Sequence, residues 1–72
     1  MIIIKLKEMK LMQERKLGRS ITWKEISEET NIPTNTLSRI SRLEGYNINM
    51  KDLDALCKYF KISPGDLLEQ KN

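Results

Sequence analysis

Apolar residues along the chain recur at the spacing of a helix, and polar segments with helix-start signals separate the apolar groups. The clearest stripe, Leu53, Leu56, Cys57 and Phe60, matches the single buried face of one helix. Read outward from the helix starts, the pattern predicts an all-α fold of five helices. They are expected over residues 6–16, 22–30, 34–43, 49–60 and 63–69.

Three helix starts share one design, in which a polar capping residue stands between apolar residues that can pack across the first turn. Thr22, with Glu25 three residues later, forms a capping-box sequence. Asn49 begins the second such start, and Ser63, followed by Pro64, begins the third. Each cap is expected to stabilise its helix by about 1 kcal/mol. Glycines at positions 18 and 45 are expected to end two of the helices.

The first residues do not continue the helical pattern. Ile2, Ile3 and Ile4 are β-branched, which favours a short N-terminal strand. The same segment could instead cover the core or pair with a second chain, and the sequence leaves these three alternatives open. It is also the longest apolar run, and it is too short to span a membrane or to form the apolar part of a secretory signal. We therefore expect a cytoplasmic protein without a membrane partner.

The composition argues against an enzyme. The 72 residues suffice for a single domain, expected over residues 1–72, and they include one cysteine and no histidine. An internal disulfide is therefore impossible, and the usual general base is missing. Cys57 lies on an apolar stripe and is interpreted as a core residue, and Met9, Met12 and Met50 are interpreted as core filler. The sequence predicts no enzymatic activity, no cofactor and no metal site.

The charge is distributed unevenly along the chain. The net charge is +3, and residues 1–24 carry seven basic side chains against two acidic ones. An acidic group, Glu25, Glu28 and Glu29, follows, and then comes a polar segment that holds Arg39 and Arg42. A basic surface assembled from separate segments suits a polyanionic partner such as nucleic acid.

The segment from residue 22 to residue 43 has the pattern of two short helices joined by a sharp turn. Asn31 is a residue type that tolerates the left-handed conformation that such a turn requires. Ile32 follows directly and can anchor the turn in the core, while the small Ser27 permits close helix approach. Leu37 and Ile40 give the second helix an apolar inner side. This order of residues is typical of a helix-turn-helix.

The opposite side of the helix over residues 34–43 is polar and lacks acidic residues. Thr34, Asn35, Ser38, Arg39 and Arg42 share this side by their helical spacing. Asparagine can bond adenine in two places, and arginine can do the same with guanine. An ordinary solvated helix face usually carries Glu and Lys pairs, which are missing here. The face is therefore interpreted as a reader of the DNA major groove.

With these residues in place, the chain resembles the Cro and lambda-repressor-type (XRE-like) helix-turn-helix family. The resemblance rests on "ITWKEISEETNIPTNTLSRI" and on "NINMKDLDALCKYFKISPGDLLE", and it extends from about Leu6 to Leu68. It implies a compact five-helix fold and a sequence-specific transcriptional regulator of the repressor type. It also implies double-stranded DNA as the partner and frequent homodimer formation.

Site residues follow from the matched positions and from the chemistry of the polar face. The residues expected to read bases are Thr34, Asn35, Ser38 and Arg39. Those expected to contact phosphates are Thr22, Trp23, Lys24, Thr36, Arg42, Tyr46 and Asn47. For Trp23 and Tyr46, packing against the core is an equally weighted alternative.

The sequence departs from the family pattern at four places. Trp23 stands where the family usually has Gln, Asn31 where it has Gly, and Pro33 where it has Ser. The segment over residues 13–20 is longer than usual, and its basic residues, including Arg19, could reach the DNA backbone.

A second hypothesis is an antitoxin-like or other protein-interaction module on the same fold. The acidic group at residues 25–29 and the Ile2–Ile4 segment could bind a protein partner. RNA binding is a weaker alternative, since the four aromatic residues form no evident cluster for stacking bases.

Overall fold

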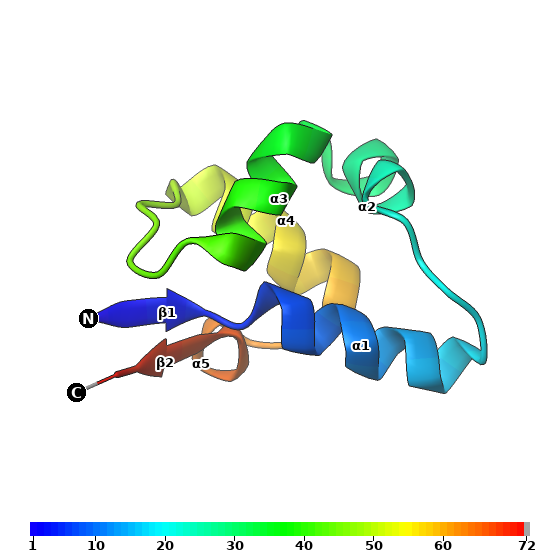
Figure 1. Ribbon diagram of the computed structural model, residues 1–72, viewed down its shortest axis with the longest axis horizontal. Helices are drawn as coiled ribbons and strands as arrows, with labels where there is room; N and C mark the ends of the chain where they lie inside the picture. The colour runs from blue at the N-terminus through cyan, green and yellow to red at the C-terminus, as the bar shows by residue number, and fades with distance from the viewer. Residues whose placement is uncertain (72) are drawn as a thin grey trace.

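The order of elements in the computed structural model, which describes residues 1–71, confirms five helices and adds a small sheet. The chain forms β1 (Ile2–Ile4), α1 (Leu6–Leu17), α2 (Trp23–Thr30), α3 (Thr34–Arg42), α4 (Met50–Phe60), α5 (Pro64–Leu67) and β2 (Leu68–Gln70). Figure 1 shows α1 to α4 packed around a common centre, with the two strands side by side next to the chain ends. None of the helices in residues 1–71 is both long enough and apolar enough to cross a membrane.

Local hydrogen bonds at the helix starts confirm the three predicted N-termini. The Thr22 hydroxyl accepts from the Glu25 backbone N–H at 3.2 Å, and the Asn49 side chain accepts from the Asp52 N–H at 2.7 Å. At α5, the Asp66 carboxylate accepts from the Ser63 N–H at 3.2 Å. Each bond satisfies a backbone N–H that the first turn leaves without a partner inside the helix.

Helix ends follow the prediction at one glycine and depart from it at the other. Gly18 adopts φ +69° directly after α1, and its N–H bonds the carbonyl of Glu14 at 2.8 Å. In contrast, α3 ends at Arg42, because Leu43 turns to an extended conformation. The helix thus ends one residue before the predicted position. Gly45 lies in the following loop, with φ also +69°, so the prediction that Gly45 closes α3 is wrong.

The last helix is shorter than predicted because its expected end belongs to a strand. β2 pairs with β1 in antiparallel register, with Ile2 opposite Gln70 and Ile4 opposite Leu68. The Lys71 N–H donates to the Met1 carbonyl at 2.8 Å, which extends the ladder. Of the three alternatives for the Ile2–Ile4 segment, the structure has the strand, and its partner is the C-terminal end of the same chain. The segment also covers part of the core, because Ile4 packs against it.

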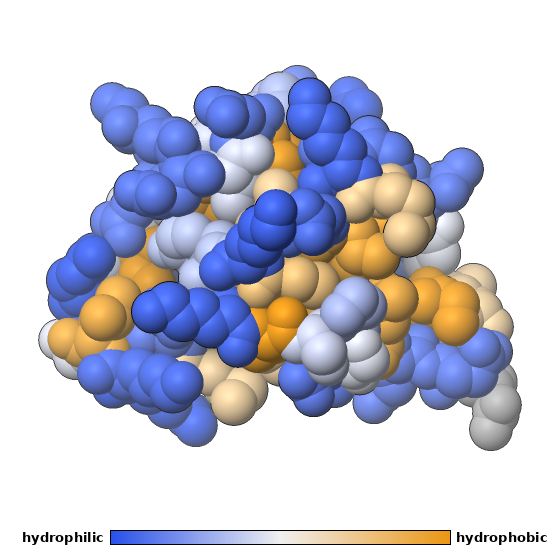
Figure 2. Space-filling view, turned by 180° about the vertical axis from the view of Figure 1, so that it is seen from behind, coloured by the Kyte–Doolittle hydropathy of each residue, from blue (hydrophilic) through white to orange (hydrophobic). Residues whose placement is uncertain are grey.

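Every helix contributes to one core. Its buried side chains are Leu6, Ile21, Ile26, Ile32, Leu37, Ile40, Leu53, Leu56, Cys57, Phe60 and Leu67. The predicted stripe of α4 is therefore confirmed, including Cys57 as a core residue. Of the three methionines, Met9 packs against the core, but Met12 is 54% exposed and Met50 78% exposed, so their assignment as core filler is wrong. Figure 2 shows that one face of the molecule has apolar surface lying between polar side chains.

Candidate nucleic-acid interface

The turn between α2 and α3 has the geometry that the sequence predicted. Asn31 is left-handed, with φ 62°, and its N–H donates to the Ser27 carbonyl at 2.8 Å. Ile32 is fully buried, and the Thr30 hydroxyl, itself buried, donates to the Ile26 carbonyl at 2.7 Å. The turn is thus fixed by one apolar anchor and by satisfied polar groups, which sets the direction in which α3 leaves it.

The two sides of α3 differ sharply in exposure. Leu37 and Ile40 are buried at 0% and 1% exposure. Thr34, Asn35 and Arg39 are exposed. We call the set Thr34, Asn35, Ser38, Arg39 and Arg42 the outer face of α3. The structure brings the four residues predicted to read bases together on this face, with Ser38 half-buried at its edge.

The outer face keeps donors and acceptors free for a partner. Arg39 forms no ion pair or hydrogen bond with another side chain among residues 1–71. The side-chain oxygen of Asn35, Oδ1, accepts from the Thr36 backbone N–H at 2.9 Å. This bond leaves one lone pair of Oδ1 and the whole side-chain NH₂ group unused. At the far end of the face, Arg42 Nε donates to the Ser38 hydroxyl at 3.3 Å.

The residues predicted to contact phosphates lie on two segments that flank α3. At the start of α2, Thr22 and Lys24 are exposed, whereas the Trp23 ring is half-buried against the core. In the loop after α3, Asn47 is exposed and Tyr46 is half-buried against the core. The bodies of both aromatic side chains therefore follow the packing alternative, and both residues keep an accessible part.

Two further residues predicted to contact phosphates lie within α3. Thr36 is half-buried, and Arg42 is exposed near the C-terminal end of the helix. Both sit on a helix whose first turn carries no acidic residue.

The junction between α1 and α2 uses its charges within the protein. Arg19, expected near the DNA backbone, instead forms a two-pronged ion pair with Glu25, with both nitrogen–oxygen distances at 3.0 Å. The pair lowers the pKa of Glu25 and raises that of Arg19. Glu25 is thereby drawn away from the N-cap, so only the Thr22 half of the predicted capping box forms.

A second carboxylate orders the same junction. Glu14 accepts from the Ile21 backbone N–H at 2.7 Å and from Lys10 Nζ at 3.3 Å. The bond from Ile21 is the main reason that the pKa of Glu14 is lowered. Neither the Arg19–Glu25 pair nor the bond from Ile21 to Glu14 was predicted from the sequence. The partners are six and seven residues apart across a loop, and no local pairing rule covers such spacings.

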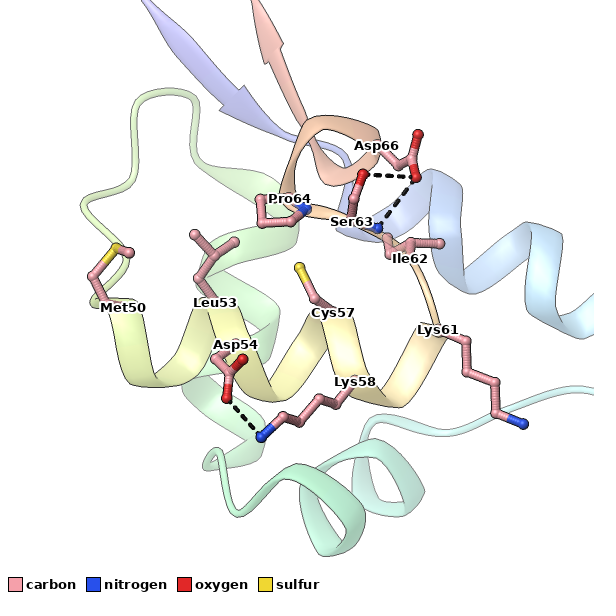
Figure 3. Close-up of a pocket in the computed structure, with 10 residues that line it drawn as sticks. All are labelled: Met50, Leu53, Asp54, Cys57, Lys58, Lys61, Ile62, Ser63, Pro64 and Asp66. Carbon is pink, nitrogen blue, oxygen red and sulfur yellow. Dashed lines mark hydrogen bonds and ion pairs between the residues drawn. The ribbon is translucent and has the colours of Figure 1, made fainter.

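A hollow of about 580 Å³ lies elsewhere, along α4 and the turn into α5. Figure 3 shows its mixed lining, in which apolar side chains lie beside the Asp54–Lys58 ion pair, and the Cys57 side chain points from α4 toward Ser63 and Pro64. Burial raises the pKa of the Cys57 thiol, which keeps the thiol protonated and a poor nucleophile at neutral pH. Within residues 1–71, no three His, Cys, Asp or Glu side chains gather where they could hold a metal ion.

Comparison with known proteins agrees with this geometry. The family model described as the Cro/C1-type HTH DNA-binding domain matches residues 5–71, which include α2, the turn and α3. Searches of curated proteins and of solved structures gave no match. The family match spans nearly the whole chain, and the chain therefore belongs to the Cro/C1-type helix-turn-helix DNA-binding domains.

Proposed function

We propose that this protein is a sequence-specific transcriptional regulator that places α3 in the major groove of double-stranded DNA. The observation that carries the proposal is the outer face of α3, which is exposed, free of acidic residues and held outward by the buried Leu37 and Ile40. Residues in the N-terminal part of a recognition helix are those that reach base edges. Thr34 and Asn35 occupy that part of α3.

The side chains of the outer face supply the chemistry for reading bases. The free NH₂ group and remaining lone pair of Asn35 suit adenine, once the side chain turns toward a base. Arg39 presents a guanidinium without an internal partner, which suits the two acceptors of guanine. Ser38 and Thr34 add hydroxyl groups that can serve either bases or phosphates.

Phosphate contacts on both sides of α3 would fix its position in the groove. The residues that we assign to them are Thr22, Trp23, Lys24, Thr36, Arg42, Tyr46 and Asn47. Such contacts give affinity and salt dependence, but they carry no sequence information directly.

The proposal includes a homodimer, because one short helix touches few base pairs. A two-fold dimer would read half-sites about 34 Å apart, one turn of DNA. Residues 1–72 would act as one domain, which is consistent with a core that runs from Leu6 to Leu67. Sedimentation with and without DNA tests this part, and a strict monomer in both conditions would contradict it.

The central experiment is selection of preferred duplexes from a random pool, followed by sequencing. We expect a short enriched motif with two-fold symmetry, and binding that weakens steeply as salt increases. A pool that stays random after repeated rounds would contradict sequence-specific recognition.

The alternative of a protein-interaction module keeps one of its two supporting features. Glu28 and Glu29 are exposed on α2, but the Ile2–Ile4 segment is already paired with β2. A salt-dependent shift of random duplex DNA by the pure protein favours the regulator. Failure to shift any duplex at low salt would favour the interaction module.

A further inference from the structure

A cleft of about 560 Å³ opens between α1, the start of α2 and α3. Lys7 and Lys10 line it from α1, Trp23 from α2, and Ser38 and Arg42 from α3. Ser38 and Arg42 also belong to the outer face of α3, so the cleft and that face are continuous. Neither Lys7 nor Lys10 was singled out as a DNA contact by the sequence pattern.

The cleft is basic, unlike the neighbouring hollow at α2. Three cations line it, and none of its lining residues within the described chain is acidic. The hollow on α2, in contrast, is lined by three carboxylates, Glu25, Glu28 and Glu29, together with Thr22 and one cation, Lys24. A concave surface of one charge sign concentrates oppositely charged ligands, so this cleft favours an anion.

Two of the three cations of the cleft, Lys10 and Arg42, are held in position before any ligand arrives. Lys10 Nζ lies 5.2 Å from the centre of the Trp23 ring and 3.3 Å from the Glu14 carboxylate, and its side chain is only 20% exposed. The Ser38 hydroxyl holds Arg42 Nε at 3.3 Å. Lys7 lies one turn before Lys10 on the same side of α1 and remains exposed. Fixed cations lose less conformational entropy on binding than mobile ones.

We propose that this cleft binds a backbone phosphate of the duplex, with Lys7 and Lys10 as its main ligands; this inference rests on the proposed function. A duplex that receives the outer face of α3 in its groove must bring a sugar-phosphate strand past Ser38 and Arg42. The phosphate on that strand meets Lys7 and Lys10 beside the Trp23 side chain. The interaction would extend the footprint from α3 to α1 and fix the tilt of the recognition helix.

The first test measures how duplex affinity depends on salt in Lys7→Ala, Lys10→Ala and the double variant. Removal of one lysine–phosphate interaction should lower the slope of log K against log salt by about 0.9, and the double variant should show about twice that reduction. Lys10→Arg keeps the charge and should keep the slope. The control, Lys58→Ala, removes the same charge from the exposed side of α4 and should leave the slope unchanged.

A variant that is expected to bind duplex DNA more tightly excludes loss of folding as the explanation for weaker binding. Glu14→Gln keeps an oxygen for the Ile21 N–H but removes the negative charge beside Lys10. We expect it to bind duplex DNA more tightly than the unmodified protein. Unchanged or weaker binding by this variant, in a folded protein, would contradict the cleft as a phosphate site.

Trp23 is the only tryptophan of the chain, so its fluorescence reports on the cleft directly. Duplex DNA should change the emission in the unmodified protein and not in the double lysine variant. The same fluorescence measurement is then made with inorganic phosphate in place of the duplex. If inorganic phosphate alone produces the lysine-dependent change and the duplex does not, the cleft is a site for small anions and the inference fails.

The outcomes separate this inference from the proposed function. If the unmodified protein shifts no duplex, the proposed function fails and the cleft loses its ligand. If the unmodified protein binds duplex DNA and the double lysine variant shows the same salt slope, only the cleft assignment fails.

Discussion

Two arginines show how differently two polar regions of this molecule use charge. At the junction between α1 and α2, Arg19 meets Glu25 through two contacts of 3.0 Å. On the outer face of α3, Arg39 is exposed and has no ion-pair partner among residues 1–71. The first charge is paired on the surface with a carboxylate of the same chain, and the second is available to a ligand.

The difference separates charged residues that bond within the protein from those that remain available for a partner. At the junction, Arg19 bonds to Glu25 of α2, and Glu14 of α1 bonds to the backbone of Ile21. Unpaired polar groups on α3 add little to stability, because water already satisfies them in the folded and unfolded chain. A substitution at the junction should therefore affect unfolding, whereas one on the outer face should affect DNA binding.

The largest expected effect is on the free energy of unfolding, and it comes from the buried side of α3, beneath the outer face. Leu37→Ala empties a fully buried position and should lower the free energy of unfolding by about 2–5 kcal/mol, measured by urea denaturation. The control, Leu43→Ala, changes a side chain that is 50% exposed and should stay within about 0.5 kcal/mol. Equal losses in the two variants would show that α3 is not anchored through Leu37.

Arg39→Ala should weaken binding to the selected duplex by about 1–3 kcal/mol and relax the preference at one base position. Its free energy of unfolding should stay within about 0.5 kcal/mol, because the side chain has no internal partner. Arg19→Ala is the crossed control: it should shift unfolding and leave the base preference intact. An unchanged affinity for Arg39→Ala would remove this residue from the reading surface.

Thr22→Ala should destabilise the free protein by about 1 kcal/mol, because the Glu25 N–H loses its hydrogen-bond acceptor at 3.2 Å. Thr22→Ser keeps the hydroxyl and should recover most of that loss. Thermal unfolding without DNA measures both. No difference between the two variants would mean that the cap contributes little and that the Arg19–Glu25 pair alone positions the start of α2.

The smallest effect is an acid sensitivity of the junction. The pKa values of Glu14 and Glu25 lie below the ordinary 4.5 in the folded chain, chiefly through the Ile21 N–H and the Arg19 guanidinium respectively. The stability that they contribute is present above that ordinary value and is lost as the pH falls through the lowered values.

Urea denaturation at a series of pH values from about 7 to about 3 should show this loss. A double variant, Glu14→Gln with Glu25→Gln, should show a shallower decline. If its decline is as steep as in the unmodified protein, acid unfolding has its origin in other carboxylates.

The sequence by itself determined those features that depend on neighbours along the chain. Thr22, Asn49 and Ser63 marked three helix starts correctly, because capping bonds join residues only three positions apart. The left-handed Asn31 and the buried Ile32 were readable for the same reason, since turn chemistry is local. The inward and outward sides of α3 followed from helical spacing alone.

Only the tertiary structure decided which distant segments meet. It paired Ile2–Ile4 with Leu68–Gln70 and so ended α5 early, drew Glu25 from its own helix cap to Arg19, and brought Lys7 and Lys10 beside Arg42. Local propensity contains no information on such pairs, because their distance depends on how the helices pack around the whole core. The outer face of α3 could thus be predicted from the spacing of one helix, whereas the basic cleft that borders it could not.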